Sequence, residues 1–75
     1  MAQRITRAHI EAKCATAASL TGKPLHIDGA YGGWAVHMTV NEFGGVRDLT
    51  NGHYPARHVA AFLDGMIHAA RLIKE

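Results

Sequence analysis

The hydrophobic pattern of this 75-residue chain changes its period close to its two prolines, Pro24 and Pro55. Between them, apolar residues alternate with polar ones, as in half-buried strands, whereas after Pro55 they follow the three-and-four spacing of a helix. A chain of this length has room for one core. The pattern therefore predicts a single domain over residues 1–75, with an α+β fold in the order helix, strands, helix.

The segment before Pro24 is predicted to be helical. From Gln3 to Thr21 it contains neither proline nor glycine, and alanine, the best helix former, recurs through it. Gly22 stands where a helix takes a left-handed C-terminal cap, and Pro24 follows where the helix cannot continue. We expect the first helix to end at Thr21.

Three strands are expected between the prolines. Alternation begins at Leu25 to Asp28, is clearest from Trp34 to Asn41, and returns briefly from Val46 to Leu49. Because the connections are short, neighbouring strands are expected to pair antiparallel. The pattern predicts a three-stranded antiparallel meander with one apolar and one polar face.

Glycine-rich segments connect these strands. The first, within "IDGAYGGWAVH", lacks the lysine and the following helix of a phosphate-binding loop, and it leads into a strand. We interpret Asp28 to Gly33 as a hairpin connection, with Tyr31 folding over an edge and Trp34 starting the core face. In the second, "NEFGG", Gly44 and Gly45 are expected to supply the positive φ angles of a tight turn.

A second helix is predicted after Pro55, which suits a first helical turn because it has no N–H to leave unpaired. The helix is amphipathic and is expected to dock on the sheet, so that both helices cover one face of it. Its polar side carries Arg57, Asp64, His68 and Arg71. Its predicted buried side consists of Val59, Phe62, Leu63, Met66, Ala70 and Ile73.

A stripe of small residues, Ala61, Gly65 and Ala69, lies beside that buried side. Glycine inside a helix costs about 1 kcal/mol relative to alanine, which indicates the close approach of another backbone. The same stripe in a second subunit is one candidate for that backbone, and the first helix is the other. The first helix offers the matching small residues Ala8, Ala12, Ala15 and Ser19.

The chain has six histidines but no metal-binding motif of the HExxH or HxxxH kind. His26 and His37 are expected to face each other across the first hairpin on the polar side of the sheet, near Asp28. A structural zinc site needs four convergent ligands, and Cys14 is the only cysteine. We interpret the histidines as solvated surface side chains and Cys14 as buried and unreactive, and we predict no metal site and no cofactor.

The other polar groups also lack a catalytic arrangement. His53 and His58 flank Pro55 at the start of the second helix. Asp64 and His68 lie four residues apart on its polar side, as in an ordinary surface pair. No catalytic residue is predicted, and we expect that the chain is not an enzyme.

Charge and hydropathy restrict the partners. The formal net charge is +2 and the isoelectric point is about 9.0, but the basic residues are scattered, whereas a nucleic-acid site is usually a concentrated patch. No apolar stretch approaches the roughly 18 residues of a membrane span, and the N-terminus lacks the apolar core of a signal peptide. We expect a cytoplasmic protein without membrane association.

Three segments, "LHIDGAYGGWAVH", "NEFGGVRDL" and "YPARHVAAFLDGMIHAAR", resemble small proteins encoded by tailed phages and prophages. The likeness covers Leu25 to about Arg71, while Phe43 and the helix start "ARH" differ from the group's pattern. The resemblance implies the same order of strands and closing helix, and an accessory protein acting in a bacterial cytoplasm with a phage or host protein as partner. It implies no activity and no site residue.

A chain of this size buries only about 60% of its unfolded surface, so a partner chain would add stability that a monomer lacks. We therefore expect a non-enzymatic protein-interaction module that self-associates, with a dimer favoured. The alternative is a small basic nucleic-acid-binding regulator that uses Arg4, Arg7 and Lys13 of the first helix together with His26, His37 and Arg47 on the polar face of the sheet. The candidate interaction surface consists of Ala61, Gly65, Ala69, His26 and His37.

Overall fold

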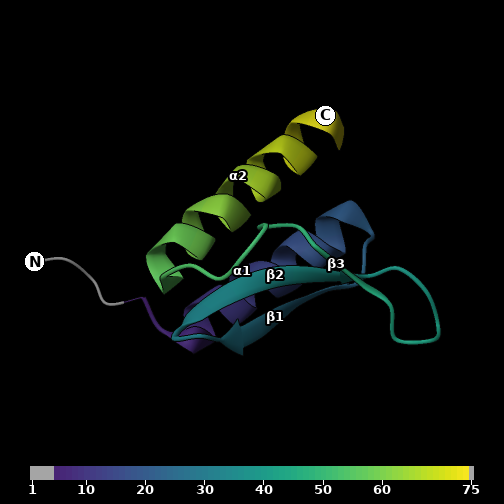
Figure 1. Cartoon of the computed structure of the whole chain (residues 1–75). Coiled ribbons are helices and arrows are strands. Elements are labelled where there is room, and N and C mark those ends of the chain that lie inside the picture. The colour runs from purple at the N-terminus through teal and green to yellow at the C-terminus, as the bar shows by residue number, and fades with distance from the viewer. Residues whose placement is uncertain (1–4, 75) are drawn as a thin grey trace, which may run out of the picture.

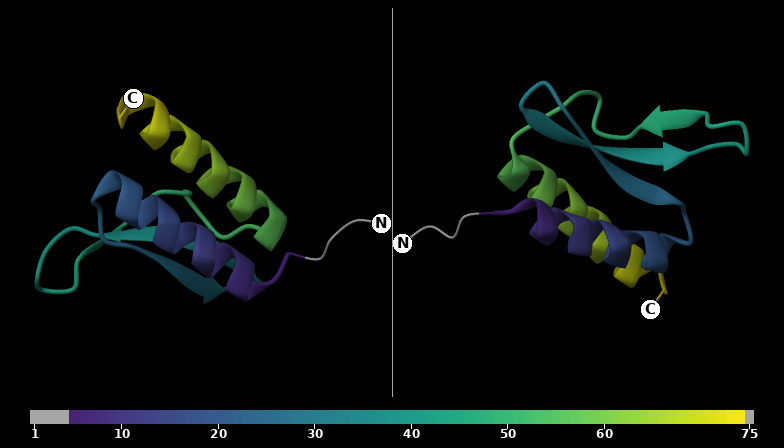
Figure 2. Two further views of the ribbon diagram at one scale, coloured as in Figure 1. Left: turned by 180° about the vertical axis from the view of Figure 1, so that it is seen from behind. Right: turned by 90° about the horizontal axis from the view of Figure 1, so that it is seen from below.

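The computed structural model describes residues 5–74 and has the expected α+β fold. Both helices cover one face of a three-stranded antiparallel sheet of strand order β1-β2-β3 (Figures 1 and 2). The opposite face of the sheet, here called the outer face, carries no helix. The elements are α1 (Arg7–Thr21), β1 (Leu25–Ala30), β2 (Gly33–Thr39), β3 (Val46–Asp48) and α2 (Ala56–Lys74).

Caps set both ends of α1. The Oγ1 of Thr6 accepts a hydrogen bond from the N–H of His9 at 3.3 Å, and this N-cap is the start signal that composition alone did not provide. At the other end Gly22 has a φ of 70° and its N–H donates to the carbonyl of Ala18 at 2.9 Å. The expected end at Thr21 is confirmed.

The core fills the space between the two helices and the inner face of the sheet. The side chains of Ile10 of α1, Val36 of β2, and Val59 and Leu63 of α2 are fully buried. Each such burial contributes about 1.5–3 kcal/mol, so this small set supplies much of the folding free energy. Trp34 packs at the rim of the core.

The indole of Trp34 lies across Gly29 of β1. A Cβ at Gly29 would stand 2.6 Å from the Trp34 ring, so only glycine leaves room for it. The guanidinium of Arg7 lies 5.3 Å from the centroid of the same ring, within the range of a cation–π contact. The expectation that Trp34 starts the core face is confirmed.

The buried side of α2 differs in part from the predicted one. Ile73, expected in the core, is 85% exposed, whereas Ala60 and Ile67, which were not expected there, are buried. The reason is that α2 packs against α1 as well as against the sheet, which moves the centre of its buried side toward Leu63 and Ile67.

The small-residue stripe of α2 does not pack against α1, so this expectation is wrong. Ala61, Gly65 and Ala69 are exposed, and a Cβ at Gly65 would meet no atom within 4 Å. The matching residues of α1 are exposed as well, because the helices meet through their core residues instead. The stripe in a second subunit remains a prediction.

The β1–β2 hairpin is tighter than expected. Its connection is only Tyr31 and Gly32, with φ angles of 54° and 71°, the signature of a type I′ turn. Residues 28–30, expected in the connection, belong to β1, and six register pairs join the strands from Leu25↔Met38 to Ala30↔Gly33. Tyr31 is 95% exposed at the tip.

The second hairpin uses its two glycines differently. Gly44 has the expected positive φ, 85°, but Gly45 is required for space, since the Asn41 side chain lies 2.5 Å from where its Cβ would be. The Oδ1 of Asn41 accepts hydrogen bonds from the N–H groups of Phe43 and Gly45. Val40, expected in the strand, lies beyond the end of β2 and is about half exposed.

Residues 49–54 run back beside β2 before α2 begins. Trp34 and Tyr54 exchange two backbone hydrogen bonds of 2.8 and 2.9 Å, and the carbonyl of Val36 accepts one from Leu49 at 2.9 Å. The segment between β3 and α2 thus extends the sheet on that side. The carbonyl of Pro55 accepts the first hydrogen bonds of α2.

Two glycines should respond in opposite ways to an added methyl group. Gly65→Ala is expected to raise the free energy of unfolding by about 0.5–1 kcal/mol, because the site is open and alanine favours helix. Gly33→Ala is expected to lower it by at least about 1 kcal/mol, because its Cβ would lie 3.0 Å from the backbone of Tyr54. Urea unfolding measures both. A loss of stability in Gly65→Ala would show that this glycine touches another molecule in solution.

Candidate functional site on the outer face of the sheet

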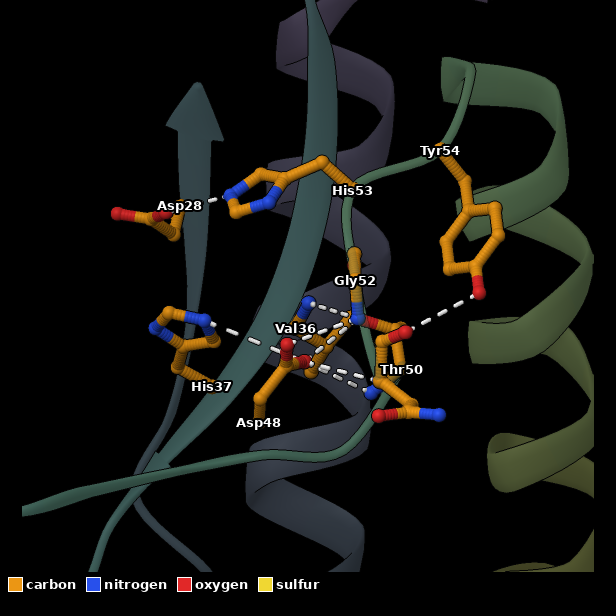
Figure 3. A network of polar contacts seen from close by, with 9 residues as sticks. Asp28, Val36, His37, Asp48, Thr50, Gly52, His53 and Tyr54 are labelled. Carbon is orange, nitrogen blue, oxygen red and sulfur yellow. Dashed lines mark hydrogen bonds and ion pairs between the residues drawn. The ribbon is translucent and has the colours of Figure 1, made fainter. Parts of the chain in front are cut away.

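Five ionisable side chains gather on the outer face of the sheet, and Figure 3 labels Asp28, His37, Asp48 and His53 among them. His26 and His37 are register partners on β1 and β2, as expected, and His37 is the register partner of Asp48 on β3. Successive side chains of a strand point to opposite faces, so these residues lie opposite the core side chains Ile27 and Val36. We call this set the outer-face cluster: His26, Asp28, His37, Asp48 and His53.

Short distances connect the cluster. The Nε2 of His53 lies 2.8 Å from the Oδ2 of Asp28, and the Nε2 of His37 lies 4.0 Å from the Oδ1 of Asp48. The ring of His37 is edge-on to that of His26 at 5.7 Å between centroids, and to that of His53 at 6.3 Å. The three imidazoles thus form a continuous row flanked by two carboxylates.

The cluster is more buried than solvated surface histidines would be. The side chains of His37 and His53 are only 16% and 17% exposed. Ala35, which shares the outer face with His37, is fully buried although no helix lies there. The cluster therefore covers the centre of this face, and the interpretation as solvated side chains is wrong for His37 and His53.

Asp48 places His53 in the cluster by shaping the loop between them. Its carboxylate accepts hydrogen bonds of 2.8–3.1 Å from the hydroxyl and the N–H of Thr50 and from the N–H groups of Asn51 and Gly52. Asn51 and Gly52 have positive φ angles of 58° and 129°. The chain therefore turns back over the sheet, a path that the hydrophobic pattern did not predict. The signal was present in "DLTNG", since Asp, Asn and Gly are typical of turns stabilised by side-chain to backbone hydrogen bonds.

His58, expected beside His53, lies apart from the cluster. Its ring stacks on that of Tyr54, with centroids 4.6 Å apart and an interplanar angle of 14°. The ring of Tyr31, at the tip of the first hairpin, is instead edge-on to His53 at 5.4 Å. Two histidines five residues apart in sequence thus have separate surroundings.

Both carboxyl groups of the cluster have a lowered pKa. The hydrogen bond to His53 is the main cause for Asp28, followed by desolvation, which opposes it, and by the fields of His37, His53 and His26. For Asp48, desolvation raises the pKa, but the hydrogen bonds from Thr50 and Gly52 together with His37 outweigh it. The folded protein therefore favours both as carboxylates.

Within residues 5–74, no three His, Cys, Asp or Glu side chains are placed to hold a metal ion together. The cluster has the donors of an acid–base site, but its members contact one another. Of the hollows found among residues 5–74, one is lined by His26, and none is lined by Asp28, His37, Asp48 or His53. The arrangement suits a polar network that ties β1, β2, β3 and the 49–54 segment together.

The remaining candidate residues stay apart from the cluster. The stripe Ala61, Gly65 and Ala69 lies on α2, on the other side of the sheet. Asp64, expected to pair with His68, instead forms an ion pair with Lys13 at 2.6 Å, because α1 lies beside it. Both lie along a hollow of about 320 Å³ between the helices, with His68. Cys14 is buried, as expected, and desolvation, together with the charge of Glu11, raises the pKa of its thiol.

Comparison with models of protein families, with curated proteins and with solved structures finds no match to the chain. In the part of the chain that the structure describes, neither helix has the length and apolar character needed to cross a membrane.

Removing the Asp48 carboxylate should loosen the 49–54 segment. Asp48→Ala is expected to lower the free energy of unfolding by about 1–2 kcal/mol, because several donors lose their acceptor. Amide exchange at Asn51 and Gly52 should accelerate. Glu42→Ala, which removes an exposed carboxylate from the other hairpin, is the matched control. Equal effects of the two variants would contradict this role.

Stability should fall in acid because of the same two carboxyl groups. Their folded pKa values lie below the unfolded value of about 3.9, so the unfolded chain binds more protons in that range. The stabilisation is complete above about pH 5, where the unfolded chain is also fully deprotonated, and it is lost as the pH falls through the folded pKa values. The free energy of unfolding of Asp28→Asn/Asp48→Asn should depend less on pH than that of the parent chain. Parallel curves would exclude these carboxyl groups as the cause.

Proposed function

We propose that this chain is a non-enzymatic protein-interaction module that associates with a second copy of itself. The observation that carries the proposal is the free edge of β1. This strand lies at one end of the sheet, spans six residues in regular register, and contains neither proline nor bulge. A strand edge of this kind is a template for pairing with another strand.

The backbone groups available on that edge follow from the hydrogen bonds of β2. Trp34 bonds to Tyr54 and the carbonyl of Val36 bonds to Leu49, so these groups face away from β1. In an antiparallel ladder, the backbone groups of two opposite residues either both point toward the partner strand or both point away from it. Gly29 and Ile27, their register partners, therefore direct N–H and C=O groups out of the sheet. No hydrogen bond joins these groups to another part of residues 5–74.

The edge of β3 is a weaker template. This strand has only three residues, and two of them, Arg47 and Asp48, are charged. Charged residues and short length are the usual means by which proteins protect a sheet edge. The contrast favours β1 as the edge that receives a partner.

Two further observations support the proposal. The outer-face cluster is closed over Ala35, and of its members His26 alone lines one of the hollows found among residues 5–74, which favours a binding role over catalysis. The resemblance to small proteins of tailed phages and prophages supports an accessory role in the cytoplasm of a bacterial host, where a phage or host protein would be a further partner.

Binding of nucleic acid has less support. Arg7 pairs with Glu11 at 2.8 Å and Lys13 with Asp64 at 2.6 Å, which neutralises two of the basic groups that this alternative uses. The outer face also carries the carboxylates of Asp28 and Asp48, which repel phosphates.

Sedimentation equilibrium over micromolar to hundred-micromolar concentrations tests the proposal. The expected result is a reversible rise from the monomer mass to twice that mass. Fluorescence anisotropy with labelled single-stranded and duplex DNA at low salt is expected to show no binding in the same range. A monomer at every concentration would contradict self-association, and tight DNA binding would favour the alternative.

A further inference from the structure

We infer that two copies pair through antiparallel β1 strands, with Ile27 opposite Ile27 of the second copy, so that His26 of each copy meets Asp28 of the other. This inference rests on the proposed self-association and specifies its interface. The two copies would form one continuous sheet with all helices on the same face.

The backbone limits the register to those in which outward-facing residues of the two copies lie opposite each other. The outward-facing groups belong to Ile27, Gly29 and, by the same alternation, Leu25, whose N–H already donates to the carbonyl of Lys23 at 3.0 Å. With a two-fold axis at Ile27, the two Ile27 residues exchange N–H···O bonds, and each Gly29 N–H reaches the free carbonyl of a Leu25. If one strand were shifted by one residue, each outward-facing residue would lie opposite a residue whose N–H and C=O groups already point toward β2.

The side chains select it independently. Residues 26 and 28 then form non-hydrogen-bonded pairs, whose Cα atoms lie about 4.5 Å apart and whose side chains are close. His26 is exposed, and the side chain of Asp28 is 43% exposed although its Oδ2 binds His53. The strand is thus self-complementary, because an imidazole N–H of His26 can donate to a carboxylate, and two-fold symmetry forms the contact twice. An axis at His26 or Asp28 would place like side chains opposite each other, and an axis at Leu25 or Gly29 would pair neither His26 nor Asp28 with its complement.

The apolar side of the edge also fits a second β1. A hollow of about 250 Å³ lies where β1 meets α1, lined by Cys14, Ala15, Leu25 and Ile27 together with Glu11 and His26. Leu25 and Ile27 are only half-buried in the single chain. Their counterparts from a second copy would cover them, and the small side chain of Ala15 leaves room for the approach.

A charge exchange tests the pairing. Asp28→Lys places an ammonium group opposite His26 of the other copy, and His26→Asp places a second carboxylate opposite Asp28. Each single variant is therefore expected to raise the dimer dissociation constant at least about tenfold. The double variant His26→Asp/Asp28→Lys opposes carboxylate and ammonium again, with their positions exchanged, and should return within about threefold of the parent.

These variants distinguish a loss of the contact between the two copies from a loss of contacts within one copy. Asp28→Lys and the double variant both lose the contact with His53, so recovery in the double variant cannot arise from that contact. His26→Asn, which is neutral, is the control for His26→Asp and is expected to weaken the dimer less than the carboxylate does.

Hydrogen exchange of the parent chain provides a second readout that requires no variant. The amides of Ile27 and Gly29 should exchange rapidly in dilute solution and become protected as the concentration rises. A chain that is monomeric throughout would overturn the proposed function together with this interface. A dimer in which these amides stay unprotected, or in which the double variant is as weak as the singles, would overturn only the β1 pairing.

Discussion

The carboxylate of Asp48 determines the path of the chain between the sheet and α2. It collects donors from Thr50, Asn51 and Gly52, and the turn that results brings His53 over the outer face and Tyr54 beside Trp34. One side of β2 is thereby closed by irregular chain, while the far side of β1 stays open. The polar cluster results from this turn, whereas the free edge of β1 lies at the other end of the sheet.

The outer face shows how a two-layer domain can manage without a second helical layer. Burial of Ala35 needs a cover, and imidazole rings provide one, because they pack edge-on while their nitrogens find carboxylates. Such a cover works only when each polar group has a partner, since an unpaired buried one is costly. Among the described residues no buried side-chain nitrogen or oxygen lacks a hydrogen bond.

Periodicity and caps were sufficient to predict the order of the elements, the end of α1 at Gly22, and the facing of His26 and His37 across the hairpin. They were insufficient where a side chain bonds to the backbone of an irregular turn or where two elements pack against the same helix. The position of His53 depends on Asp48, which no periodic signal reports, and the buried side of α2 depends on α1, which places Ile67 inside and Ile73 outside. The two glycines of the second hairpin look alike in sequence, yet Gly44 is needed for its positive φ angle, whereas Gly45 is needed because a Cβ there would collide with the Asn41 side chain.

The setting of Trp34 has an optical consequence. Its indole, the only one in the chain, touches β1 at Gly29 and lies under the guanidinium of Arg7 at the start of α1. Emission from this single fluorophore therefore senses two distant parts of the chain at once. Separation of the first hairpin or fraying of the first helical turn would each change its local polarity, so the molecule carries an intrinsic spectroscopic reporter for the joint between helix and sheet.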